Sequence, residues 1–113
     1  MGSPEKVLKT LGDENRFKII RLLLSHDFCV GAISHHLGIS KPAVSQHMKI
    51  LREAGLVKGE KRGYWTHYVV DRNILNEVGG MLLEMAKRQQ YSGTVGIFEK
   101  MPESKTKAKK GGY

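Results

Sequence analysis

The sequence predicts a mainly α-helical domain with one small β-hairpin (α+β), ordered as four helices, two strands and a fifth helix. Two changes of pattern support this prediction. Apolar residues recur every three or four positions from Val7 to Ala54 and again from Asn73 to Gln90, as is typical of amphipathic helices. Between these stretches, residues 56–70 are rich in aromatic and β-branched side chains, which favours strands. A chain of 113 residues with 40% apolar side chains has room for one domain with a modest core, which we place at residues 1–90.

The first two helices are predicted at Pro4–Leu11 and from Asp13 to Leu24. Gly12 separates them, and the carboxylate of Asp13 can cap the free N–H groups at the start of the second helix. The helical spacing predicts that four side chains of the second helix face the core: Phe17, Ile20, Leu23 and Leu24.

The next two helices are predicted to form a helix-turn-helix. Gly38 can adopt the left-handed conformation that ends a helix at Val30–Leu37, and Ser40 can cap a second helix at Lys41–Ala54. The apolar face of that second helix consists of Val44, Met48 and Leu51. Its opposite face carries side chains that can hydrogen-bond to phosphates or base edges: Lys41, Ser45, Gln46 and Lys49. This arrangement is typical of a DNA-reading motif, although an ordinary helical hairpin with a solvated face has the same periodicity.

A two-stranded hairpin is predicted at Leu56–Lys61 and Tyr64–Val70, with Arg62 and Gly63 at the turn. Three basic residues gather at one end of it: Lys58, Lys61 and Arg62. A basic hairpin directly after a recognition helix indicates a wing that contacts the phosphate backbone or the minor groove. The alternative is a solvated hairpin with incidental lysines.

The last helix is predicted at Asn73–Gln90. Its apolar stripe consists of Ile74, Val78, Met81, Leu82 and Met85. Each of the two adjacent glycines, Gly79 and Gly80, costs about 1 kcal/mol against alanine in a helix, a cost that is easier to explain where another backbone approaches closely. We therefore predict that this helix packs on a second copy of the chain, the alternative being that it folds back on its own core. Residues 91–113 have the composition of a flexible basic tail.

The net charge of +8 favours a polyanionic partner, most commonly nucleic acid, although an acidic membrane surface would also fit. Together with the helix-turn-helix pattern, it predicts double-stranded DNA as the partner. The N-terminal residues have no apolar signal region, and no apolar run approaches the roughly 18 residues that span a bilayer. We therefore predict no transmembrane segment. A single cysteine is consistent with a reducing cytoplasm.

The sequence does not indicate an enzyme. It contains no Ser/His/Asp arrangement, phosphate-binding glycine loop or pair of carboxylates at a useful spacing. We predict no catalytic residue and no cofactor.

The amino-acid sequence of several stretches resembles that of the ArsR family of bacterial and archaeal repressors, also called the ArsR/SmtB family. These stretches are Leu11–Ile20, Leu37–Met48, Leu51–Val57 and the strand ending Tyr68-Val69-Val70, which together extend over about Val7 to Asp71. The resemblance implies a winged helix-turn-helix homodimer, assembled through its first and last helices, that binds an imperfect palindrome and represses transcription until an inducer weakens binding.

In such relatives, the positions that match Lys41, Pro42, Ser45 and Gln46 face the major groove, which is the face that periodicity also selects. We therefore predict the following DNA-contacting residues: Ser40, Lys41, Pro42, Ser45, Gln46, Lys49, Lys58, Lys61 and Arg62.

The inducer is not identified by the resemblance. Relatives that sense arsenic carry three cysteines before the turn, whereas the matching positions here hold Cys29, Gly31 and Ser34, and soft metalloids need two or three thiolates. Relatives that bind zinc at the dimer interface use histidines of the last helix, which contains none here. We predict no metal site, with Cys29 and His26 as the candidate ligands should one exist. The favoured alternative is a small buried cysteine beside polar histidines, and a redox role for Cys29 near a helix N-terminus stays open.

A second function is a winged-helix module that docks on another protein and no longer reads DNA. Such a module should carry apolar residues on the outer face of the second motif helix. The lysines and amides on that face favour DNA.

Overall fold

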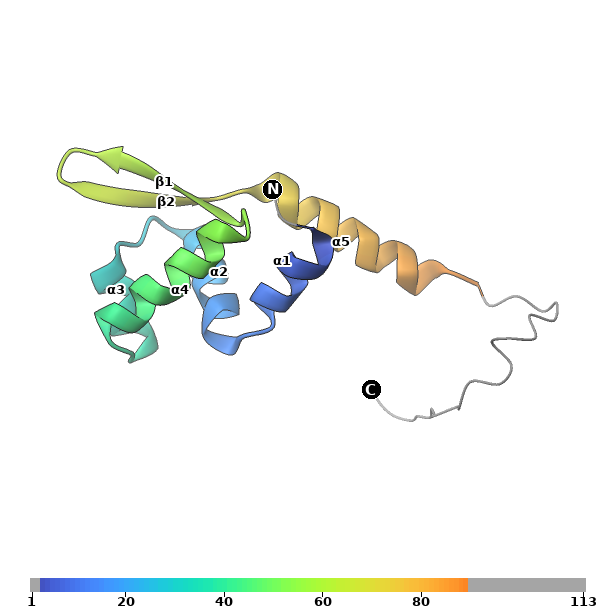
Figure 1. Ribbon diagram of the computed structural model, residues 1–113, viewed down its shortest axis with the longest axis horizontal. Coiled ribbons are helices and arrows are strands. Elements are labelled where there is room, and N and C mark those ends of the chain that lie inside the picture. The colour runs from blue at the N-terminus through green and yellow to red at the C-terminus, as the bar shows by residue number, and fades with distance from the viewer. Residues whose placement is uncertain (1–2, 90–113) are drawn as a thin grey trace.

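The computed structural model describes residues 3–89 and has the predicted order of elements (Figure 1). The helices are α1 (Pro4–Leu11), α2 (Glu14–Ser25), α3 (Val30–Leu37), α4 (Lys41–Glu53) and α5 (Arg72–Lys87), and the strands are β1 (Val57–Arg62) and β2 (Trp65–Val70). The predicted fold class is confirmed. The tail predicted at 91–113 lies outside the described residues, so the structure does not test that boundary.

Four of the five helices begin at a side-chain cap, which explains why each starts where it does. The Ser3 hydroxyl accepts from the N–H of Lys6, and a carboxylate oxygen of Asp13 accepts from the N–H of Arg16. Ser40 and Asp71 cap α4 and α5 in the same way. Each cap satisfies an N–H group that has no partner within its helix.

The hydrophobic core lies where α1–α4 and the first half of α5 meet the base of the hairpin. Its largest fully buried side chains are Val7, Ile19, Ile33, Val44, Met48, Leu51 and Leu56. The prediction for α2 was partly wrong, because Phe17 is 49% exposed and Ile19 is fully buried in its place. Apolar residues occur on nearly every side of this helix, so periodicity alone does not select the stripe that faces α4.

The hairpin is a regular antiparallel pair that extends from the helical body past α3 (Figure 1). Val57 pairs with Val70 at its buried base, and Arg62 pairs with Trp65 at the far end. The turn is therefore Gly63 and Tyr64, and the prediction that Arg62 sits in the turn is corrected by one residue. Gly63 has φ +66°, a conformation that glycine adopts without steric cost and that a two-residue hairpin turn requires.

Helix α5 follows β2 after one residue and leaves the body at the end opposite the hairpin tip (Figure 1). Ile74 and Val78 are buried against the core, and α5 packs on α1. Further along, Leu82, Leu83 and Met85 are exposed. Among residues 3–89, no helix has the length and apolar character needed to cross a bilayer.

Candidate nucleic-acid interface

The turn between α3 and α4 is built by local hydrogen bonds. Gly38 has φ +69°, and its N–H donates to the carbonyl of Ser34 over 2.9 Å. The Ser34 hydroxyl donates to the carbonyl of Ile39, and the Ser40 hydroxyl accepts from the N–H of Ala43 over 3.1 Å. These bonds fix the angle at which α4 leaves the turn, so the outer face of α4 has a defined direction relative to α3.

The outer face of α4 is a stripe of polar side chains that do not contact the core. We call this stripe the recognition face, and it consists of Lys41, Pro42, Ser45, Gln46 and Lys49, all of them exposed. The opposite side of the helix holds the buried Val44, Met48 and Leu51. Among the predicted contact residues, these five and the exposed Ser40 therefore lie together, at the turn and along one helix.

The side chain of Lys41 runs back over the first turn of α3. A Cβ atom at Gly31 would lie 3.6 Å from its Cε and 3.9 Å from its Nζ. The ammonium group thus lies near the first turn of α3, whereas Ser45, Gln46 and Lys49 lie farther along α4.

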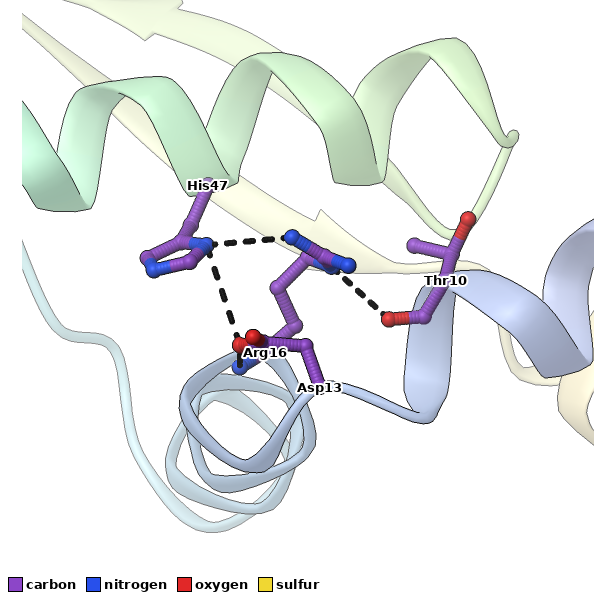
Figure 2. Close-up of polar contacts among 4 residues, drawn as sticks. All are labelled: Thr10, Asp13, Arg16 and His47. Carbon is purple, nitrogen blue, oxygen red and sulfur yellow. Dashed lines mark hydrogen bonds and ion pairs between the residues drawn. The ribbon is translucent and has the colours of Figure 1, made fainter.

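The inner edge of α4 is tied to α1 and α2 by a polar cluster that sequence reasoning did not find (Figure 2). Arg16 donates from Nε to the carbonyl of Thr10 over 2.8 Å, and its Nη1 lies 3.4 Å from Nδ1 of His47. The same His47 nitrogen is 4.0 Å from a carboxylate oxygen of Asp13. One guanidinium therefore links the end of α1, the start of α2 and the middle of α4.

Arg16 and Asp13 both lie close to the same ring nitrogen of His47. A guanidinium has only donors, so the contact with Arg16 is a hydrogen bond when Nδ1 of His47 accepts. The pKa of Asp13 is lowered, chiefly because its carboxylate accepts from the backbone N–H of Arg16. Burial opposes this shift, and the neighbouring Arg16 and His47 lower the pKa further. This geometry favours a structural hydrogen bond for His47.

The basic residues of the wing differ in whether they already form ion pairs within the protein. Lys58 and Lys61 are exposed, and neither forms an ion pair within residues 3–89. Arg62 is already paired, with Glu60 at 3.0 Å and with Asp27 at 3.6 Å. Asp27 also lies 3.9 Å from Nδ1 of His67. Asp27, in the connector between α2 and α3, thus lies beside the hairpin, and Arg62 must exchange a carboxylate for a phosphate to contact DNA.

The candidate metal ligands do not form a site among the described residues. Cys29 is exposed at the N-terminus of α3, so the expectation that it is buried was wrong. The His26 ring packs edge-on against Phe28, with its Nδ1 3.2 Å from the hydroxyl of Ser25, and His36 packs on the same phenyl ring. Within residues 3–89, no three His, Cys, Asp or Glu side chains gather as metal ligands.

A helix-turn-helix with an exposed polar recognition face, followed by a basic hairpin, defines the class of winged helix-turn-helix DNA-binding regulators. Residues 13–58 match the model of the arsR family of bacterial regulatory proteins. The transcriptional repressor SdpR of Bacillus subtilis is 34% identical over 71 residues, which cover 63% of this chain and 79% of that repressor. The chain belongs to the ArsR family of transcriptional regulators.

Solved structures agree with this assignment. An ArsR-like transcriptional regulator from Rhodococcus sp. RHA1 is 26% identical, with a TM-score of 0.66, and the match covers 74% of this chain and 78% of that one. A homodimeric winged helix-turn-helix DNA-binding domain from Mycobacterium bovis shares the fold at 20% identity, with a TM-score of 0.61 and coverage of 80% and 85%.

Proposed function

We propose that the protein is a homodimeric repressor that binds a palindromic operator in the cytoplasm through α4 and the wing of each protomer. The observation that carries this proposal is the recognition face, which is exposed, polar and basic on a helix whose other side is buried. Such a face contributes nothing to the core and matches the chemistry of base edges and phosphates. The similarity to a protein named as a transcriptional repressor supports repression as the outcome.

The residues of the interface divide by chemistry. Gln46 and Ser45 carry uncharged groups that can hydrogen-bond to base edges, and an amide can bond adenine through two atoms at once. The remaining predicted residues contact phosphates or pack beside the backbone: Ser40, Lys41, Pro42, Lys49, Lys58, Lys61 and Arg62. Sequence preference thus depends on Ser45 and Gln46, and salt-dependent affinity depends on the lysines of α4 and on the wing.

The dimer is proposed to form through α1 and α5. The exposed side chains Leu82, Leu83 and Met85 lie on the part of α5 that extends beyond the core. A Cβ atom at Gly79 or Gly80 would meet nothing within 4 Å among residues 3–89, so packing within this part of the chain does not explain these glycines. A partner helix that approaches closely would explain both the glycines and the uncovered apolar surface.

The protein-docking alternative receives no support from α4. The large apolar residues exposed in the described part of the chain lie on α2, the hairpin and α5: Phe17, Tyr64, Trp65, Val69, Leu82, Leu83 and Met85. A surface that docks on protein through the recognition helix would need such residues on α4 itself.

The test begins with DNA selected from a random-sequence library by the purified protein, followed by fluorescence anisotropy at several salt concentrations. A symmetric motif should be enriched. Gln46→Ala should lower the preference for the selected base pair about 5- to 150-fold, which corresponds to roughly 1–3 kcal/mol. Lys49→Ala should weaken binding to all sequences alike and reduce the salt slope by about 0.9.

Gln89→Ala, which removes an exposed amide beyond the end of α5, is the matched control and should bind as the unchanged protein does. Failure to enrich any motif would refute sequence-specific binding. An equal loss for selected and random DNA in Gln46→Ala would refute the assignment of the recognition face.

A further inference from the structure

We propose that Tyr64 and Trp65, at the tip of the wing, form an uncharged second contact with DNA by packing their rings against sugars and base edges in the minor groove. The inference rests on the proposed function and extends it to two residues that neither the basic pattern nor the helix-turn-helix selects.

The first reason is exposure without a structural role. Tyr64 is 99% exposed and Trp65 is 65% exposed, the two largest exposures among the large apolar residues of the described chain. Tyr64 lies in the two-residue turn and Trp65 opens β2. The core ends at the base of the hairpin with Val57 and Val70, so neither ring contributes to it. Large aromatic surface left in water is typical of a binding site.

The second reason is the charge around these rings. Arg62 pairs directly across the hairpin with Trp65, and Lys61 precedes it. Aromatic rings that stack or wedge, beside cations that neutralise phosphates, form the combination that binds nucleic acid, because every sugar and base has an apolar face next to an anionic backbone. The exposed apolar part of α5 lies at the other end of the molecule, so the tip is not continuous with the proposed dimer surface (Figure 1).

The third reason is that the base of the hairpin is fixed on the helical body. Val57 and Val70 are buried there, and Asp27 lies beside His67 farther along β2. The N–H of Asp71 donates to the carbonyl of Leu56 over 2.8 Å and closes the hairpin base. A wing fixed at its base presents its tip in a defined direction relative to the recognition face, which lowers the ordering cost of the contact with DNA.

The experiment uses the fact that Trp65 is the only tryptophan of the chain, so that its emission reports on the wing tip alone. The full chain is titrated with the duplex that it selects from random DNA, and acrylamide quenching of Trp65 is measured free and bound. We expect the quenching constant to fall at least about threefold in the complex. Tyr64→Ala and Trp65→Ala should each weaken binding about 5- to 100-fold, with an unchanged salt slope because no charge is lost.

Three further variants separate this contact from other effects. Trp65→Phe should recover most of the affinity, since it keeps a ring. Val69→Ala, which trims an exposed residue of the same hairpin away from the tip, should bind normally. Lys61→Ala should lower the salt slope by about 0.9, unlike the aromatic variants.

Equal quenching in free and bound protein, together with unchanged affinity of Trp65→Ala, would overturn the inference. If Gln46→Ala still changed the base preference, the proposed function would survive that result. Protection of Trp65 that grows with protein concentration in the absence of DNA would instead assign the tip to contact between copies. If no duplex is selected, the proposed function fails and the inference fails with it.

Discussion

Replacing Arg16 by methionine removes the guanidinium that joins α1, α2 and α4 while keeping a long, helix-favouring side chain. The hydrogen bond from Nε to the Thr10 carbonyl is short, at 2.8 Å, and that carbonyl belongs to the last turn of α1, where helix carbonyls lack a partner. The contact with His47 at 3.4 Å is near the limit of a hydrogen bond and contributes less.

A hydrogen bond from a charged donor is worth about 1.5–3 kcal/mol, and the orphaned carbonyl is only part-buried, so we expect a loss of about 2 kcal/mol in the free energy of unfolding. For a domain of this size the loss corresponds to a fall in Tm of about 8–16 °C. Arg16→Lys keeps the charge but cannot reach both partners, and it should fall between the two.

The assay is urea unfolding followed by circular dichroism at one protein concentration, because dimerisation makes apparent stability depend on concentration. Arg21→Met is the matched control, since Arg21 is exposed on the same helix. If Arg16→Met unfolded within about 0.5 kcal/mol of Arg21→Met, the cluster would not stabilise the helix junction and our reasoning would be refuted.

Two further predictions concern acid stability and assembly. Because folding lowers the pKa of Asp13, its carboxylate stabilises the fold above about pH 4 and this contribution disappears as the pH falls through the lowered pKa. Asp13→Asn keeps a capping oxygen, so urea unfolding at a series of pH values should show a deficit against the unchanged protein at pH 6 that shrinks as the pH falls below about 4. A deficit that stays constant over this range would contradict the assignment. Leu82→Glu should raise the dimer dissociation constant at least about tenfold in sedimentation equilibrium, since it buries a charge in an apolar contact. Gln89→Glu, which adds the same charge beyond α5, should not, and a dimer unaffected by Leu82→Glu would exclude that surface.

Features fixed by nearby residues could be predicted from the sequence. The left-handed Gly38, the caps at Asp13 and Ser40 and the exposed stripe on α4 each depend on neighbours within one or two helical turns. Because these local signals agree with one another, the order of elements could be predicted, and the structure confirms it.

Features that depend on packing could not be predicted in the same way. Phe17 and Ile19 have similar hydrophobicity, and only the position of α4 decides which is buried. Arg16 and His47 lie 31 positions apart, so no spacing rule connects them. The pairing of Arg62 with Asp27 likewise appears only when the hairpin is placed beside the connector.

The junction at Asp71 has a mechanical consequence. Its N–H is bound to Leu56, its carboxylate caps α5, and the neighbouring Arg72 donates to the carbonyl of Leu24 over 3.3 Å. These hydrogen bonds connect β2, the last strand of the wing, rigidly to α5, the helix that carries the proposed dimer surface. In the proposed dimer, a change in the angle at which the two α5 helices cross would move both wings at once. This angle would therefore set the distance between the two DNA half-sites that the dimer can bind.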